Sequence, residues 1–332
     1  MPFPSRRLLL AAGMTAPGSA LHAQNLARDL PGGWPERPIR LVVPAAGGAG
    51  TADTIARILA QELDRRLPQR TIVENRPGAN GNVGATAVAR AAPDGHSFLF
   101  GWAGTLAISP ALYRDLPFDP LRDFEPVILL GNVPNILVVN NALGIRTLEE
   151  LTARLRAAPG SLTYGSSGNG SSMHLAGELY RQATRTEMVH VPYAGIAQGF
   201  TDLFTGRIQL MFNLVTGAAP QIRAGQVTPV AVLSDRRSPI LPDVPTTAEM
   251  GMPGLEFGSW FCLMAPRGTP APIRAAMNRL VNEIMTEPDS RARLEAQGLD
   301  ILGGAPERLT ALLTSELRRH ADLVRFSGAS ID

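Results

Sequence analysis

Short apolar runs alternate with amphipathic segments of helical period along most of the chain. Runs of three to five apolar residues predict strands, and segments with apolar residues at i, i+3 and i+4 predict helices. Strands are predicted at 39–43, 71–74, 97–101, 127–130, 136–139, 162–164, 188–191, 208–212 and 229–233, with a further strand-like run over 256–265. The clearest helices are predicted at 54–67, 173–183, 271–286 and 306–326. This alternation predicts an α/β fold with mostly parallel sheets.

Capping residues mark several helix starts. Thr147 with Glu150, and Thr246 with Glu249, fit the capping-box pattern, in which each residue satisfies a backbone N–H of the other. Thr269 before Pro270 offers an N-cap followed by proline at the first helical position. We therefore expect a helix to begin at each of these three places.

Two short stretches can carry the chain between two lobes, because no flexible Gly/Ser linker separates the halves. The first is 131–135, with Pro134 between two apolar runs, and the second is the Pro- and Gly-rich stretch 252–258. The sequence thus predicts one discontinuous lobe of residues 34–131 and 257–332, into which a lobe of residues 132–256 is inserted.

A glycine-rich loop lies between a strand and a helix in each predicted lobe, at 44–53 and at 165–172. Such loops point free backbone N–H groups and the positive end of a helix at an anion. The alternative is a tight turn whose glycines only permit positive φ. Two such loops in one chain favour a single anion held between two lobes.

Some side chains in and near these loops have a second interpretation. The Thr51 hydroxyl could help to hold a carboxylate, whereas Asp53 would repel an anion and is better explained as an N-cap or hinge partner. The serines and Asn169 of the second loop could serve as caps and turn residues alone. His174, one turn into its helix, could simply be a packing histidine with satisfied hydrogen bonds.

The basic residues exclude several kinds of chemistry. The 332-residue chain is 45% hydrophobic and has a formal charge of +2, and all 31 of its basic residues are arginine. Without lysine there is no Schiff-base lysine, no P-loop lysine and no lysine general base. The arginines are scattered rather than clustered, which argues against nucleic-acid binding.

Enzyme motifs match only in part. Residues 48–52 fit the first five positions, G-x-G-x-x, of the dinucleotide fingerprint, but Asp53 stands at the sixth position, which needs Gly or Ala. Glu74, however, stands where the fingerprint has the acid that binds the ribose. The stretch 165–169 misses the G-x-S-x-G nucleophile elbow by one position. The five histidines lack zinc-site spacing. We therefore expect no catalytic residue, metal or cofactor, with a dinucleotide-dependent enzyme as the alternative.

The N-terminus has the pattern of an export signal. Ser5, Arg6 and Arg7 precede the modestly apolar stretch 8–20 and a run of small residues, close to a twin-arginine motif. We predict a signal peptide over 1–23, cleaved after Ala20 or Ala23. The single Cys262 lies in an apolar run, and we expect it to be buried.

Together these features resemble the Bug family of periplasmic solute-binding proteins, the receptors related to tripartite tricarboxylate transporters. The resemblance runs from about Trp34 to the C-terminus, and the order and spacing of its stretches make it specific. The stretches are Pro-Ile-Arg-Leu-Val-Val-Pro at 38–44, Val-Glu-Asn-Arg-Pro-Gly at 73–78, Ala-Pro-Asp-Gly at 92–95, Ser-Pro-Ala-Leu-Tyr at 109–113, the run 164–178, His-Val-Pro-Tyr-Ala-Gly at 190–195 and Leu-Pro-Asp-Val-Pro-Thr at 241–246.

The resemblance implies a type II periplasmic-binding-protein fold, with two α/β lobes, two crossover segments and a ligand cleft between the lobes. It also implies a small carboxylate ligand, held by main-chain amides and hydroxyls, and integral-membrane transporter subunits as partners. We expect a monomer in the periplasm. A ligand sensor that feeds a regulatory partner is the alternative within this class.

The same resemblance implies the site residues. The first lobe would contribute Ala46, Gly47, Gly48, Ala49, Gly50, Thr51, Asp53, Gly81, Asn82, Ala103, Gly104 and Thr105. The second lobe would contribute Ser166, Ser167, Gly168, Asn169, Gly170, Ser171, His174, Tyr193, Ala194, Gly195, Asn213 and Thr216. Asn213 stands where relatives often carry Asp, which favours a plain carboxylate over an amino acid.

Overall fold

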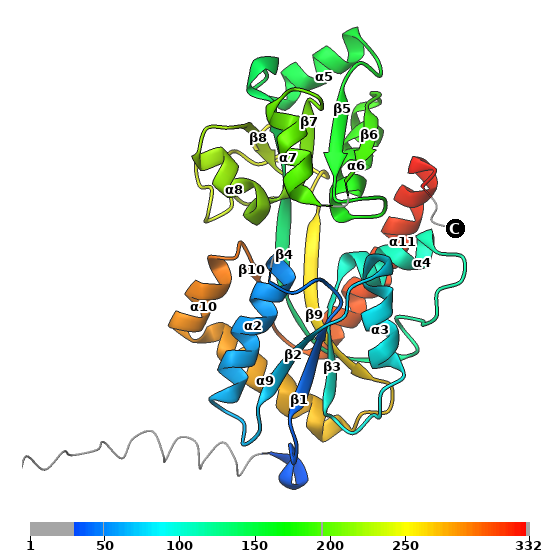
Figure 1. The fold of residues 1–332 in the computed structure, drawn as a ribbon, viewed down its shortest axis with the longest axis vertical. Helices are drawn as coiled ribbons and strands as arrows, with labels where there is room; N and C mark the ends of the chain where they lie inside the picture. Colours follow the sequence, from blue (N-terminus) through cyan, green and yellow to red (C-terminus); the bar gives the residue numbers. More distant parts are fainter. Residues whose placement is uncertain (1–29, 49, 194, 330–332) are drawn as a thin grey trace, which may run out of the picture.

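The computed structural model describes residues 30–48, 50–193 and 195–329. The predicted signal peptide, and Ala49 and Ala194 of the predicted site, lie outside these ranges. Within them, no helix is both long enough and apolar enough to span a bilayer. The chain forms the predicted α/β fold, in two lobes connected by long strands (Figure 1).

The first lobe contains a mixed sheet covered by helices (Figure 1), which corrects the prediction of mostly parallel sheets. β1 pairs in parallel with β2 on one side and with β3 on the other, and β9 runs antiparallel to β3. The strands are β1 (Ile39–Val43), β2 (Thr71–Asn75), β3 (Ser97–Trp102) and β9 (Gly258–Pro266). The helical segments are η1 (Pro31–Gly33), α2 (Thr51–Asp64), η2 (Ala79–Gly81), α3 (Asn82–Ala89), η3 (Gly104–Ile108), α4 (Ser109–Leu112), α9 (Ala271–Thr286) and α10 (Pro288–Glu295).

The second lobe repeats this plan with its own strands. β5 pairs in parallel with β6 and with β7, and β7 and β8 both run antiparallel to β4. The strands are β5 (Thr163–Ser166), β6 (Val189–Pro192), β7 (Leu210–Leu214) and β8 (Thr228–Val232). The helical segments are η4 (Asn141–Leu143), α5 (Leu148–Ala157), α6 (Ser172–Thr184), α7 (Ile196–Phe204) and α8 (Val215–Arg223).

β4 (Phe124–Val139) passes from one lobe into the other. Its first part pairs with β9 and with the short β10 (Asp300–Ile301), and its last five residues pair with β7. The two strands predicted at 127–130 and 136–139 are therefore one strand, which corrects the prediction. Pro134 lies opposite Gly258, and the ladder continues because the Asn135 N–H donates to the Phe257 carbonyl at 2.8 Å. The strand thus exchanges β9 for β7 as its partner within the stretch 131–135 that was predicted to cross between the lobes.

The last helix, α11 (Pro306–Ser327), contacts both lobes. Leu309 and Leu313 pack in an apolar cluster of the first lobe, together with Val42. Near the other end, Leu323 and Val324 belong to the apolar cluster around Phe212 in the second lobe. The C-terminal helix therefore connects the two lobes independently of the crossing strands (Figure 1).

Three predicted helix starts have different outcomes. The Thr147–Glu150 capping box is confirmed: the Glu150 N–H donates to Thr147 Oγ1, and the Thr147 N–H donates to Glu150 Oε2, both at 3.1 Å. The same two bonds form between Thr246 and Glu249, but only around a turn. A helix cannot continue there, because Gly251, Pro253 and Gly254 follow.

The predicted cap of α9 is displaced by one residue. Pro270, not Thr269, is the N-cap residue. The Thr269 hydroxyl instead donates to the Pro266 carbonyl at 2.8 Å and so closes the turn that leaves β9.

Candidate ligand-binding site

A cavity of about 250 Å³ lies between the lobes and is lined by parts of both glycine-rich loops. We call it the front cavity. The first lobe lines it with Ala45, Gly50, Thr51, Ala52, Asp53, Asn80, Trp102, Gly104, Ser259 and Phe261. The second lobe lines it with Ser167, Ser171, Ser172, Met173 and Leu214. The strands β1, β3, β5 and β7 all end toward it, which is where open α/β sheets bind ligands.

The lobes touch at the edge of the front cavity. Thr51, the first residue of α2, and Thr216, the second residue of α8, share a hydrogen bond with their Oγ1 atoms 2.7 Å apart. The two residues belong to different lobes and lie 165 positions apart in the sequence. The structure therefore represents a conformation in which the lobes are closed at this point.

The N-terminus of α2 faces the front cavity without a side-chain cap. Its N-cap is Gly50, with φ of 108°, a conformation that favours glycine. Thr51, Ala52 and Asp53 form the first turn and line the cavity. Because the first N–H groups of a helix have no partner within the helix, they can bind an anion here.

Asp53 holds the first loop in place. Its carboxylate accepts hydrogen bonds from the Gly48 N–H at 3.0 Å, from Arg57 Nε at 2.8 Å and from Asn75 Nδ2 at 2.8 Å. Burial opposes ionisation, but the hydrogen bonds from Arg57, Asn75 and Gly48 outweigh it and lower the pKa of Asp53. The ionised carboxylate thus ties the loop to β2 and to the second turn of α2.

The N-terminus of α6 faces the same cavity from the second lobe. Its N-cap Ser171 accepts a hydrogen bond from the His174 N–H at 3.2 Å, and the Ser171 hydroxyl donates to the Gly168 carbonyl at 2.8 Å. Ser172 and Met173, at the first two helical positions, line the cavity. Ser171 therefore satisfies the third N–H of the helix, whereas the first two N–H groups belong to Ser172 and Met173 in the cavity lining.

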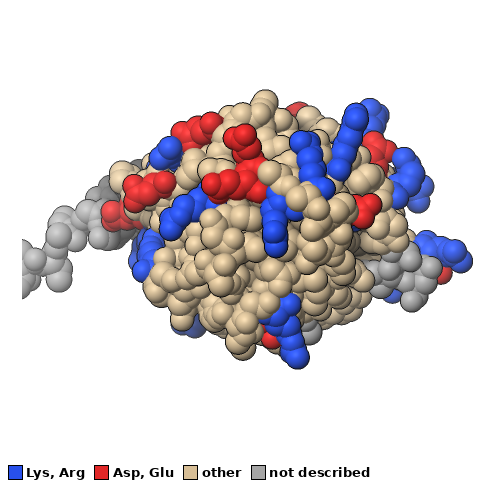
Figure 2. Space-filling model, turned by 90° about the horizontal axis from the view of Figure 1, so that it is seen from above, with Lys and Arg blue, Asp and Glu red and all other residues tan. Residues whose placement is uncertain are grey.

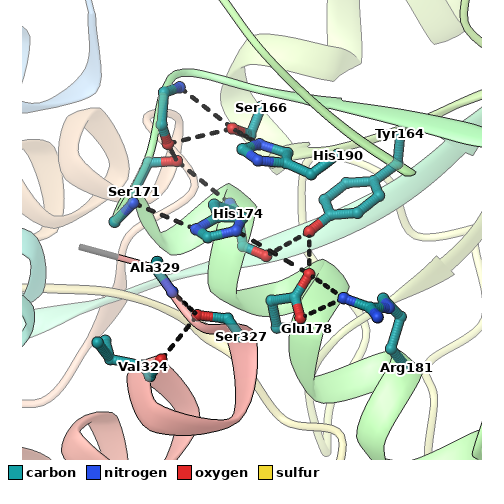
Figure 3. A network of polar contacts seen from close by, with 12 residues as sticks. Tyr164, Ser166, Ser171, His174, Glu178, Arg181, His190, Val324, Ser327 and Ala329 are labelled. Atoms are coloured by element: carbon teal, nitrogen blue, oxygen red, sulfur yellow. Dashed lines mark hydrogen bonds and ion pairs between the residues drawn. The ribbon is translucent and has the colours of Figure 1, made fainter. Parts of the chain in front are cut away.

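A buried polar network supports the second loop from behind (Figure 3). Ser166 Oγ lies 2.7 Å from His190 Nε2 and also bonds the N–H and the carbonyl of Gly168. His174 Nδ1 accepts from the Gly170 N–H at 3.2 Å, and the His174 and His190 rings stack with centroids 4.0 Å apart. These side chains therefore hold the loop rather than line the cavity.

Deeper in the network, the Glu178 carboxylate joins α6 to β5. The Tyr164 hydroxyl donates to Glu178 Oε1 at 2.6 Å, and Arg181 Nη1 pairs with Glu178 Oε2 at 2.7 Å (Figure 3). Glu178 Oε1 also lies 3.9 Å from His174 Nε2. Tyr164 belongs to β5 and the other three residues belong to α6, so the network joins the strand to the helix that follows it.

Both histidines of the network are neutral at pH 7. Burial lowers the pKa of His174. Burial, with the neighbouring His174 and Arg181, lowers the pKa of His190 to about 3. A neutral His174 agrees with the role of its Nδ1 as an acceptor, since both ring nitrogens of a charged histidine are donors.

No arginine or histidine is among the described residues that line the front cavity, and Asp53 is the one charged residue among them. An anion there would be held by two helix N-termini, by hydroxyls and by amides. On the end of the molecule seen in Figure 2, basic and acidic side chains are intermixed and form no large patch of one sign.

The structure brings only part of the predicted site to the front cavity. Gly50, Thr51, Asp53, Gly104, Ser167 and Ser171 line it. The other described residues of the prediction do not: they are Ala46, Gly47, Gly48, Gly81, Asn82, Ala103, Thr105, Ser166, Gly168, Asn169, Gly170, His174, Tyr193, Gly195, Asn213 and Thr216.

Several of these residues have another place in the structure. A Cβ on Gly81 would lie 2.2 Å from Thr105 Oγ1, so the glycine is needed for packing. The Tyr193 hydroxyl donates to Asp202 at 2.9 Å, away from the cavity lining. Asn213 is buried beside the lining residue Leu214, and its Nδ2 has no hydrogen-bond partner.

Sequence reasoning missed nine residues of the lining. Trp102 directly follows the strand predicted at 97–101, and Ser172 ends the second loop, with Met173 directly after it. Each is next to a predicted site residue, so extending the predicted set by one residue would have found them. Ser259 and Phe261 lie on the crossing strand β9, where no local motif marks them. The remaining four are Ala45, Ala52, Asn80 and Leu214.

Comparisons with known proteins agree on one family. The sequence profile described as "Tripartite tricarboxylate transporter family receptor" matches residues 55–328. Protein BugT of Bordetella pertussis is 34% identical, over 90% of this chain and 91% of its own. The structure titled "R. palustris Rpa4515 with adipate" is 36% identical, with a TM-score of 0.81, and covers 90% of this chain and 100% of its own. "MatC (Rpa3494) from Rhodopseudomonas palustris with bound malate" is 34% identical, with a TM-score of 0.76, over 88% and 100%.

Proposed function

This chain belongs to the tripartite tricarboxylate transporter receptor family, and we propose that it captures a small carboxylate between its two lobes. The resemblance to the Bug family is confirmed by the relative named BugT. We further propose that the receptor works in the periplasm, after removal of a signal peptide over 1–23, and delivers its ligand to integral-membrane subunits of a tripartite tricarboxylate system.

One observation carries the proposal: two helix N-termini, from opposite lobes, face one small cavity that no described cationic side chain lines. A carboxylate placed between α2 and α6 would accept hydrogen bonds from backbone N–H groups on both sides. Closure of the lobes would bury the anion and strengthen these bonds by lowering the local dielectric. The structures of two relatives are named with adipate and with malate, and both of these ligands are small dicarboxylates.

The geometry favours this receptor over a dinucleotide-dependent enzyme. The front cavity of about 250 Å³ is below the range of about 300 to 1,000 Å³ that drug-sized ligands need. The Gly48 N–H, which a dinucleotide phosphate would need, already donates to Asp53. A sensor would use the same cavity and would differ only in its partner.

Calorimetry with malate, succinate, adipate, citrate, aspartate and NAD(H) tests the proposal. We expect saturable binding of at least one carboxylate. Thr51→Val, which removes a hydroxyl from the cavity lining and from the contact between the lobes, should weaken binding about tenfold, the worth of one hydrogen bond to a charged group. Thr216→Val should weaken binding less, because Thr216 does not line the cavity.

The matched control is Thr201→Val, on the exposed side of α7, whose hydroxyl bonds only the helix carbonyl of Ala197. Its affinity should equal that of the wild type. Binding of NAD(H) and of no carboxylate would refute the proposal. Equal affinities for all four proteins would refute the placement of the ligand beside Thr51.

A further inference from the structure

A second cavity lies on the other side of the crossing strands. We call it the rear cavity; its volume is about 310 Å³. Leu233 and Ser234 of the second lobe line one side, and Leu302 and Leu312 of the first lobe line the other. Both lobes therefore form its walls, as they form the walls of the front cavity.

The strand β9 separates the two cavities. Gly258 and Trp260 line the rear cavity, whereas Ser259 and Phe261 line the front cavity. Successive residues of a strand point to opposite faces of the sheet, so this alternation puts the cavities on opposite faces of β9. The wall between the cavities is thus the crossing strand itself.

Lobes that rotate about such a wall change the two cavities in opposite directions. A hinge movement that separates Thr51 from Thr216 opens the front cavity and brings the two walls of the rear cavity together. We propose that the rear cavity controls the ligand affinity of the front cavity: it is wide when the lobes are closed, and a side chain that fills it keeps them closed. This inference rests on the proposed function.

The polar contacts at the rear cavity leave room for such control. Arg236 of the second lobe pairs with Asp300 of the first lobe, but the two side chains are 64% and 43% exposed. Exposed ion pairs contribute little to stability, so this pair is a weak clamp. A second contact crosses the cavity, because Arg319 Nη2 of the first lobe donates to the Glu256 carbonyl of the second lobe at 2.6 Å. How closely the rear walls approach each other therefore depends on these two contacts and on the bulk of the side chains between the walls.

The effect on affinity follows from the closed fraction. When only a fraction of the ligand-free receptor is closed, its apparent affinity is reduced by that fraction. A larger side chain in the rear cavity would destabilise the open form by steric conflict and leave the closed form intact. Ligand affinity should then rise although no residue of the front cavity has changed.

Ser234→Trp tests the proposal from the second-lobe wall, with Ser161→Trp on an exposed loop as the matched control. Spin labels on Val83→Cys and Gln198→Cys, exposed on α3 and α7, report the distance between the lobes. The native Cys262 is buried and does not take a label. Without any carboxylate, we expect Ser234→Trp to shift the distance distribution toward the closed value and the control to leave it unchanged.

Binding is measured with the tightest ligand among malate, succinate and adipate. Ser234→Trp should lower its dissociation constant about three- to tenfold, mainly through slower release. Leu312→Trp repeats the test from the first-lobe wall, in case Ser234→Trp fails to fold. An unchanged or longer distance in the folded variants would overturn the proposal. Absence of carboxylate binding would refute the proposed function alone, because the spin-label distance needs no ligand.

Discussion

The two glycine-rich loops present the same feature, a helix N-terminus, but are held by different forces. An ionised carboxylate holds the first loop, since Asp53 binds Gly48, Arg57 and Asn75. Neutral groups hold the second loop, through the bonds of His174 to Gly170 and of His190 to Ser166. Similar anion-binding geometry can thus be built with a buried ionised carboxylate or with buried, uncharged hydrogen bonds.

The loops also differ in their neighbours. A Cβ on Gly48 or on Gly50 of the first loop would meet nothing within 4 Å. A Cβ on Gly170 of the second loop would lie 1.9 Å from Leu112 Cδ1, in a helix of the first lobe. The second loop is therefore packed against the opposite lobe at Gly170, whereas open space lies beside Gly48 and Gly50 in the first loop.

The largest expected effect is the loss of stability in Gly170→Ala, which should exceed the loss in Gly48→Ala. Both glycines have positive φ, 72° and 84°, so alanine costs about 1 to 2 kcal/mol in backbone strain at either position. At Gly170 the clash with Leu112 adds overpacking, for a total of about 2 to 5 kcal/mol. Urea unfolding of the two variants measures the difference. Equal losses would show that the second loop is no more closely packed than the first.

The second largest effect is the pH dependence of the second loop. The folded-state pKa of His190, about 3, lies below the ordinary histidine value of 6.5, so the unfolded chain binds more protons between these values. Stability should therefore fall as the pH falls from 6.5. We expect the wild type to lose about 2 to 3 kcal/mol more than His190→Gln between pH 6.5 and 4. If the wild type and His190→Gln lose equal unfolding free energy over this pH range, the fold does not keep His190 neutral.

The first loop should respond to acid at a lower pH. The pKa of Asp53 is lowered from 3.8, so its stabilising effect is present above that value and is lost as the pH falls through the folded-state pKa. At pH 7, Asp53→Asn should cost about 1 to 2 kcal/mol, because it removes a charged acceptor. The gap in unfolding free energy between the wild type and Asp53→Asn should narrow below pH 4. A gap that stays constant down to pH 3 contradicts the charge-based support of this loop.

The smallest effect concerns the caps. Ser171 caps α6, whereas α2 has no side-chain cap. Ser171→Ala should cost about 1 kcal/mol, the usual effect of losing an N-cap. Ser315→Ala, at an exposed position of α11, is the control and should be neutral. If the two variants are equally stable in urea, the Ser171 hydroxyl does not contribute as a cap.

Much of the fold was predictable because its signals are local. The strand at 39–43 and the helix at 271–286 have their predicted bounds, since apolar runs and helical periodicity are short-range properties. The loops were recognised from their glycines and their setting. Two strands were predicted where β4 is one, because Pro134 is a local signal for a break, whereas the pairing with β9 is a long-range interaction.

The site was less predictable than the fold. Thr51 and Gly50 were found because they belong to the first glycine-rich loop, although the helix predicted at 54–67 in fact begins at Thr51. His174 and Ser166 have the chemistry of ligand-binding residues, yet their partners His190 and Gly170 turn them into the support of the loop. Phe261 lines the cavity only because β9 crosses between the lobes, which no local pattern near it reveals.

The position of β9 has a consequence for the order in which the molecule assembles. In the sheet, β9 lies between β3 and β4, although more than a hundred residues separate it from β4 along the chain. A growing polypeptide therefore emerges from the ribosome with β1, β2 and β3 complete and with their central neighbour still to be synthesised. The strands of the inserted lobe are synthesised in the meantime, so the lobe that begins first is finished last.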